Sequence, residues 1–144
     1  APAPAPAAET NGNTSSSGSP SDPVVQYLVL RKDLWVERGW PFGSIVAQAC
    51  HASSAAMWTS RDDECTQAYC APENIDHMHK VVLEVKGEAQ LNNLAAKLTE
   101  AGVTFKLWTE QPENYPTCLA TKPYVKSHVA AHFKRLNLCK PRID

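Results

Sequence analysis

Three polar side chains are spaced so that a helix would place them on one face. Ser44, Gln48 and His51 stand at positions i, i+4 and i+7 of a segment that is otherwise rich in small residues. The free N–H groups at the start of such a helix can bind an anion or polarise a carbonyl, and a histidine further along can act as a general base. A helix cap, a surface glutamine and a structural histidine would show the same spacing, so the pattern alone leaves both interpretations open.

Charged residues near two expected strand ends form a second group of candidates. Arg31, Lys32 and Asp33 close the first expected strand, and ligands of α/β proteins gather outside the carboxyl ends of strands. Arg31 could therefore hold a phosphate that Asp33 orients, or the two could form an ordinary surface ion pair. Glu110 follows the third expected strand, where a carboxylate can position a histidine or a water molecule, although a solvated glutamate in a turn is the commoner case.

Cysteine and histidine patterns do not predict a metal centre. The chain has five cysteines, an odd number, and no signal-peptide pattern precedes them, which favours free thiols in a reducing compartment. Cys65, Cys70, His77 and His79 fit no standard zinc finger. The pair His128 and His132 lies one helical turn apart without an evident third ligand. We therefore expect no metal and no cofactor.

Composition narrows the class of protein further. The chain has 144 residues and a formal net charge of −1, which excludes a histone-like basic protein and an acidic disordered chain. No apolar stretch approaches the roughly 20 residues that span a bilayer, so no membrane partner is expected. Charge is uneven, because residues 122–144 hold six Lys and Arg side chains against one acid. Such a basic stripe suits contacts with phosphates, or simply a solvated surface.

The elements that must position these candidates follow a regular order. Residues 1–23 are rich in Ala, Pro and Ser and predict a disordered tail, and residues 24–144 predict one domain. Within the domain we expect strands at 24–30, 80–85, 103–108 and 117–121, and helices at 44–58, 88–101 and 126–138. The order β-α-β-α-β-β-α predicts an α/β fold with a four-stranded mixed sheet covered by helices. We expect the last two strands, which are close in sequence, to be antiparallel or diagonal to each other.

Six separated motifs can be read along the domain: Leu28–Leu34, Gly43–Ala52, Lys80–Leu83, Leu107–Asn114, Thr117–Ala120 and Lys122–Tyr124. In this order they resemble the archaeal/eukaryotic-type (type two) peptidyl-tRNA hydrolase family. The resemblance covers about residues 25–140, and its later motifs are similar to the peptidyl-tRNA hydrolase domain-containing subfamily.

The resemblance implies hydrolysis of the ester that joins a peptide to the 3′ ribose of tRNA, on a compact α/β fold without a metal. It implies peptidyl-tRNA as the partner, with the ribosome and a homodimer as further expectations. It also implies a cytoplasmic location, or a mitochondrial one if a targeting segment was removed before Ala1. The expected catalytic residues are Ser44, Gln48, His51, Glu110 and Thr117, and the expected substrate-binding residues are Arg31, Lys32, Asp33, Gly43 and Asn114.

Two departures from the family pattern bear on activity. Ser44 stands where the family has a catalytic lysine after the glycine of the helix motif, which removes a cation that could stabilise an oxyanion. Glu110, followed by Gln111 and Pro112, stands where the family has Asp-Ala-Gly. We expect an ester hydrolase, and the alternative is a catalytically impaired relative that binds tRNA, a ribosome or a protein partner.

Overall fold

A buried first strand organises the sheet. In the computed structural model, which describes residues 22–142, β1 (Val24–Arg31) is buried from its second residue to its last. It pairs in parallel with β2 (His79–Val85) on one side and antiparallel with β4 (Tyr115–Thr121) on the other. Such continuous burial explains the unbroken run of apolar residues in this segment.

The remaining strands extend the sheet at its edges. β3 (Phe105–Glu110) pairs antiparallel with β4, and the short β6 (Asn137–Leu138) pairs antiparallel with β2. The order is β3-β4-β1-β2-β6, and the two-residue β5 (Tyr124–Val125) pairs with the start of β1. The α/β class and the mixed sheet are confirmed. The expected count of four strands is wrong, because sequence patterns do not reveal two-residue strands.

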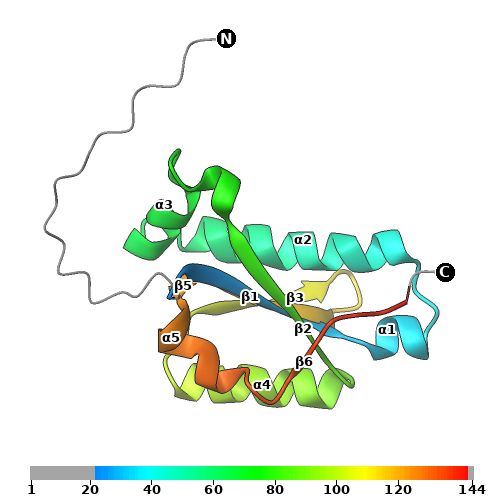
Figure 1. The fold of residues 1–144 in the computed structure, drawn as a ribbon. Coiled ribbons are helices and arrows are strands. Elements are labelled where there is room, and N and C mark those ends of the chain that lie inside the picture. The colour runs from blue at the N-terminus through cyan, green and yellow to red at the C-terminus, as the bar shows by residue number, and fades with distance from the viewer. Residues whose placement is uncertain (1–21, 143–144) are drawn as a thin grey trace, which may run out of the picture.

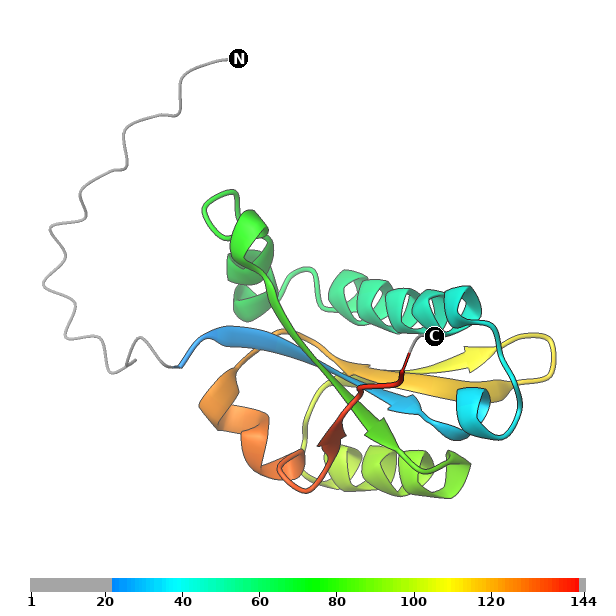
Figure 2. The same ribbon diagram turned by 45° about the vertical axis from the view of Figure 1, so that its right-hand side comes forward.

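Helices cover both faces of the sheet (Figures 1 and 2). α2 (Phe42–Thr59) packs on one face, over a core that includes Leu30, Ile45 and Ala120. α4 (Glu88–Glu100) packs on the other face with Leu91 and Leu98 in its core. The short helices are α1 (Asp33–Val36), α3 (Glu64–Cys70) and α5 (Lys126–Val129), with single 3-10 turns η1 (Ile75–His77) and η2 (Ala130–His132).

The final helix is much shorter than the sequence predicts. We expected a helix over 126–138, but α5 ends at Val129, η2 follows, and the chain becomes extended in β6. Phe133 stacks on Tyr27 with ring centroids 4.3 Å apart, and the Cys139 N–H donates to the Val82 carbonyl at 2.9 Å. These tertiary contacts outweigh the helical pattern of the segment.

The chain just before β1 is tied to α5. Residues 1–21 of the predicted tail lie outside the described residues, whereas Asp22 and Pro23 make defined contacts. The Asp22 carboxylate accepts hydrogen bonds from the Ser127 N–H and hydroxyl, and the Pro23 carbonyl accepts from the Lys126 N–H. None of the described helices is both long enough and apolar enough to cross a bilayer.

Candidate functional site

The polar face of α2 that the spacing predicts lies against β3 and β4, which the sequence did not indicate. Gln48 is buried on this face, and the hydroxyl of Thr117 in β4 donates to its side-chain oxygen at 2.8 Å. Ser44 lies one turn earlier on α2 and is partly exposed. Three of the five expected catalytic residues therefore gather at the start of α2 and the start of β4.

His51 and Glu110 meet at a tryptophan that the sequence analysis did not single out. The exposed imidazole of His51 stacks on Trp108 with ring centroids 4.6 Å apart. The Trp108 indole N–H donates to the Glu110 carboxylate at 3.3 Å. Glu110 is the last residue of β3 rather than the first residue beyond it. Trp108 is two residues before Glu110, and this strand spacing was the available signal.

The first turn of α2 leaves two backbone donors unused among residues 22–142, the N–H groups of Phe42 and Gly43. The Ser44 and Ile45 N–H groups both donate to the Pro41 carbonyl, at 3.0 and 3.2 Å. The Gly43 N–H makes no hydrogen bond within residues 22–142. Gly43 is exposed, and a Cβ built there would meet nothing within 4 Å, so there is room for a ligand beside its Cα. The start of α2 therefore combines an exposed surface with free backbone donors.

Arg31 and Asp33 form a buried ion pair rather than a surface pair. The Arg31 side chain is 1% exposed, and its guanidinium donates two hydrogen bonds to Asp33, at 3.0 and 2.6 Å. It also donates to the Pro116 carbonyl at 2.8 Å and to the Tyr115 hydroxyl at 3.0 Å. Arg31 thus holds the beginning of β4, which carries Thr117, and its guanidinium does not face solvent.

The Arg31–Asp33 pair changes the protonation behaviour of both groups. Burial raises the pKa of Asp33, but the hydrogen bonds and charges of Arg31 and Arg38 outweigh burial and leave the pKa below its ordinary value. Burial lowers the pKa of Arg31, but the hydrogen bonds and charges of Asp33 and Tyr115 outweigh burial and leave the pKa above its ordinary value. Both groups therefore stay ionised across the neutral range.

Tyr115 is a second residue that sequence reasoning missed. Its ring stacks on Trp40 with centroids 5.9 Å apart, and the guanidinium groups of Arg31 and Arg38 lie 4.6 and 5.6 Å from its centroid. These contacts join the loop before α2 to the start of β4. No sequence pattern linked Trp40 to Tyr115, because they are far apart in the chain and meet only through the sheet.

The other expected substrate-binding residues lie apart from this cluster. Lys32 is half-exposed, and its ammonium group lies 3.8 Å from the Glu84 carboxylate in β2. Asn114 lies in the turn between β3 and β4 with a φ of 58°, and its side chain accepts a hydrogen bond from Gln111. Neither residue contacts Gln48, Thr117 or His51 through a hydrogen bond in the described chain.

One lysine of the basic C-terminal segment is buried, and it does not contribute to an exposed basic surface. Lys122 is buried, its ammonium group lies 3.2 Å from Asp63 and it sits over the ring of Tyr124. Lys134, Arg135, Lys140 and Arg142 are exposed. The five cysteines are unbonded, and no three His, Cys, Asp or Glu side chains gather as metal ligands in residues 22–142.

Comparisons with known proteins identify the family. The family model for peptidyl-tRNA hydrolase PTH2 matches residues 24–139. Human and mouse proteins, each named "Putative peptidyl-tRNA hydrolase PTRHD1", are 46% identical over 127 and 125 residues. These matches cover 88% and 86% of this chain, and 89% and 88% of the relatives.

A more distant relative gives the same assignment. "Probable peptidyl-tRNA hydrolase 2" of Dictyostelium discoideum is 34% identical over 118 residues, which is 78% of this chain and 53% of that protein. The family match spans the whole sheet, both covering helices and every residue of the candidate site. The chain therefore belongs to the PTH2 family of peptidyl-tRNA hydrolases.

Proposed function

We propose that this chain hydrolyses the ester bond between a peptide and the 3′ ribose of tRNA. The observation that carries the proposal is the contact between Gln48 and Thr117, which brings the polar face of α2 onto the start of β4. Family membership supports the reaction class, and this contact supports the proposed location of the reaction. The open Gly43 N–H stands at the beginning of the same helix.

In the proposed reaction, a water molecule attacks the ester carbonyl carbon. His51 accepts the proton of the attacking water, and Glu110 holds Trp108 in place beneath the imidazole. The Gly43 N–H stabilises the negative charge on the carbonyl oxygen. The bond to the ribose oxygen then breaks, that oxygen takes the proton from His51 and becomes the 3′ hydroxyl, and the new carboxylic acid of the peptide loses its proton to solvent. An ester is an activated acyl group, so its hydrolysis demands less of the protein than the hydrolysis of an amide would.

The test is cleavage of an N-acetylated aminoacyl-tRNA by the purified chain. We expect release of the acyl group above background, a large loss in His51→Ala and a smaller loss in Glu110→Gln. His77→Ala and Glu113→Gln are matched controls, because both residues are exposed and neither contacts the site. Unchanged cleavage in both site variants would show that the residues are assigned wrongly.

A second function is favoured by one specific observation, the serine at position 44. A catalytically impaired relative that binds tRNA would lack exactly the cation that this position carries in the family. Ser44 is partly exposed on the first turn of α2, so a lysine at this position has a route to solvent. Background activity in the wild-type chain, together with a gain of cleavage in Ser44→Lys, would favour the binding protein over the enzyme.

A further inference from the structure

A basic groove lies on the face of the sheet that α4 covers, away from the candidate site. It has a volume of about 560 Å³ and runs between α4 and the segment 131–136. Its lining residues include Lys97, Lys134 and Arg135, all exposed, and no Asp or Glu. None of these three cations forms an ion pair within residues 22–142. We call this surface the α4 groove.

One wall of the α4 groove is a regular face of the helix. The residues of α4 that line the groove have the spacing i, i+3, i+4 and i+7, which places them along one side of the helix: Gln90, Asn93, Leu94 and Lys97. Lys97 therefore stands at one end of the groove, and Gln90 lies about 10 Å from it along the helix axis. An extended peptide of about three residues spans that distance.

The other wall is the segment that replaces the end of the expected helix over 126–138. Two contacts fix this segment, because Phe133 stacks on Tyr27 with ring centroids 4.3 Å apart and β6 pairs with β2. Between the two contacts the chain turns, and Lys134 and Arg135 are exposed on this turn. The fixed backbone therefore holds both cations beside the groove.

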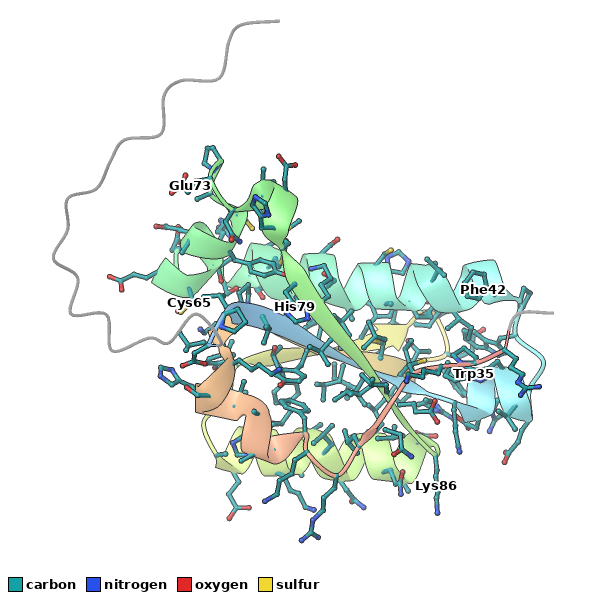
Figure 3. The ribbon with its side chains drawn as sticks, in the orientation of Figure 1. Trp35, Phe42, Cys65, Glu73, His79 and Lys86 are labelled. Atoms are coloured by element: carbon teal, nitrogen blue, oxygen red, sulfur yellow. The ribbon has the colours of Figure 1, made fainter. Side chains whose placement is uncertain are left out.

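A smaller hollow of about 150 Å³ continues the α4 groove past Gln90. The hollow and the groove share Gln90 and Arg135, so Arg135 stands near the end that lies away from Lys97. Lys86 lines the hollow and is exposed, and Figure 3 shows it beside the start of α4, on the opposite side of the sheet from α2. Glu84, which also lines the hollow, is already paired with a lysine at 3.8 Å. Unneutralised cations therefore stand at both ends of the groove.

The floor between these cations is apolar. Val85 and Leu94 are buried beneath the groove, and Leu136 is half-buried. The lining has no Phe, Tyr or Trp ring on which a nucleic acid base could stack, and a phosphate backbone would leave the apolar floor unfilled. A peptide can fill the floor with an apolar side chain and offer carboxylates to the cations on either side.

We propose that the α4 groove binds an acidic segment of a partner protein, with one apolar side chain on the floor and carboxylates at both ends. Attraction between the unneutralised cations and the acidic segment speeds the encounter of the two proteins. Burial of the apolar side chain fixes where along the groove the segment binds. This interaction is separate from ester hydrolysis, because the sheet lies between the α4 groove and the candidate site.

Binding of a labelled, end-capped peptide with one leucine between two pairs of glutamates tests the proposal on the full chain. We expect Lys97→Glu and Arg135→Glu each to weaken binding by about fivefold, since each turns an attraction into a repulsion. Lys106→Glu is the matched control, because Lys106 is exposed on β3, at the edge of the sheet away from β6, and does not line the groove. An equal loss of affinity in Lys106→Glu, or no loss in the two groove variants, would overturn the proposal.

Changes in the peptide test its charged and apolar parts separately. A peptide with glutamines in place of the glutamates should lose binding, because it offers no charge to the cations. A peptide with serine in place of the leucine should bind about tenfold more weakly, because no apolar side chain is buried on the floor. Equal affinity of the serine and leucine peptides would show attraction by charge alone and would overturn the proposal.

Carbodiimide coupling locates the peptide on the unmodified chain. The reagent joins a carboxylate to a nearby amine, and mass spectrometry should find the peptide on Lys97 and Lys134 more often than on Lys106, although all three lysines are exposed. Equal coupling at the three lysines would contradict the proposed site. Binding of a short RNA that depends on Lys97 and Arg135, without binding of the acidic peptide, would assign the groove to a nucleic acid and reject the acidic protein partner.

Discussion

At the residue scale, the hydrogen bond between Thr117 and Gln48 is the contact on which the candidate site depends. Both side chains are buried, so the Gln48 oxygen has no water to replace a lost donor. Thr117→Val keeps the shape and removes the donor, which should cost about 1–3 kcal/mol of unfolding free energy. Thr117→Ser keeps the hydroxyl and should cost only about 1 kcal/mol, for the lost methyl group.

Denaturant unfolding of the two Thr117 variants measures this difference. A valine variant as stable as the serine variant would show that the hydrogen bond contributes little. The same pair should rank in the same order for ester cleavage, because Gln48 loses its fixed orientation only in Thr117→Val.

Two glycines should respond oppositely to the same substitution. Gly43 lies in α2 with open space around it, and so Gly43→Ala should leave stability unchanged or raise it by up to about 1 kcal/mol. Gly39 has a φ of +65°, and so Gly39→Ala should lower stability by about 1–2 kcal/mol. Thermal unfolding measures both effects.

The kcat/KM for ester cleavage is a second measurement on the Gly43→Ala variant. Gly43→Ala keeps the backbone N–H and adds a methyl group beside it. If the substrate packs against Gly43, this methyl group should lower kcat/KM in spite of the retained stability. Full activity in Gly43→Ala would show that the substrate does not pack against Gly43.

Sequence spacing predicted part of the site at this scale, and the rest depended on distant contacts. The period of α2 placed Ser44, Gln48 and His51 on one face, because helical geometry is local. The role of Arg31, which is to hold the start of β4, could not be predicted from local spacing. Its burial depends on Tyr115 and Pro116, which the fold brings to it from the other side of the sheet.

At the element scale, the junction of β1 and α1 is held by charge. Asp33→Asn would leave the Arg31 guanidinium buried without its main counter-charge, at a cost of about 3 kcal/mol. Glu88→Gln is the control, because Glu88 is half-exposed and 3.8 Å from Arg31, and should cost less than about 1 kcal/mol.

The depressed pKa of Asp33 gives this junction a defined pH dependence. An acid with a lower pKa in the folded state stabilises the fold fully above its ordinary pKa of 3.8. That stabilisation is lost as pH falls through the lower, folded-state pKa. Unfolding free energies measured between pH 7 and pH 2 should therefore fall more steeply in the wild type than in Asp33→Asn. Parallel curves would contradict the assignment.

Element boundaries show where local patterns stop being informative. The long strands and the helices α2 and α4 were predicted within about two residues, because their apolar residues repeat with a clear period. The predicted helix over 126–138 failed, since its residues satisfy a helical pattern while β2 offers them an unpaired edge. A two-residue strand has no period to detect.

At the scale of the whole molecule, the sheet separates two hydrophobic cores, and only one of them lies on the face of the candidate site. The site lies on the face that α2 covers, and Leu98 lies in the core beneath α4 on the other face. Leu98→Ala should lower the unfolding free energy by about 2–5 kcal/mol. It should leave kcat for ester cleavage unchanged at temperatures where the variant is folded. A reduced kcat in the folded variant would show that the two faces are coupled.

The pairing of β1 has a consequence for how the chain acquires its structure. β1 is made first, yet its partners are β2, which ends at Val85, and β4 and β5, which lie beyond Tyr115. Contacts of such long sequence separation slow folding, because the entropy cost of closing a large loop comes before the strand pairing that offsets it. During synthesis on a ribosome, the apolar strand β1 therefore emerges before the strands with which it pairs, and it stays unpaired until they are made. The period in which this chain is most exposed to aggregation falls during its own synthesis.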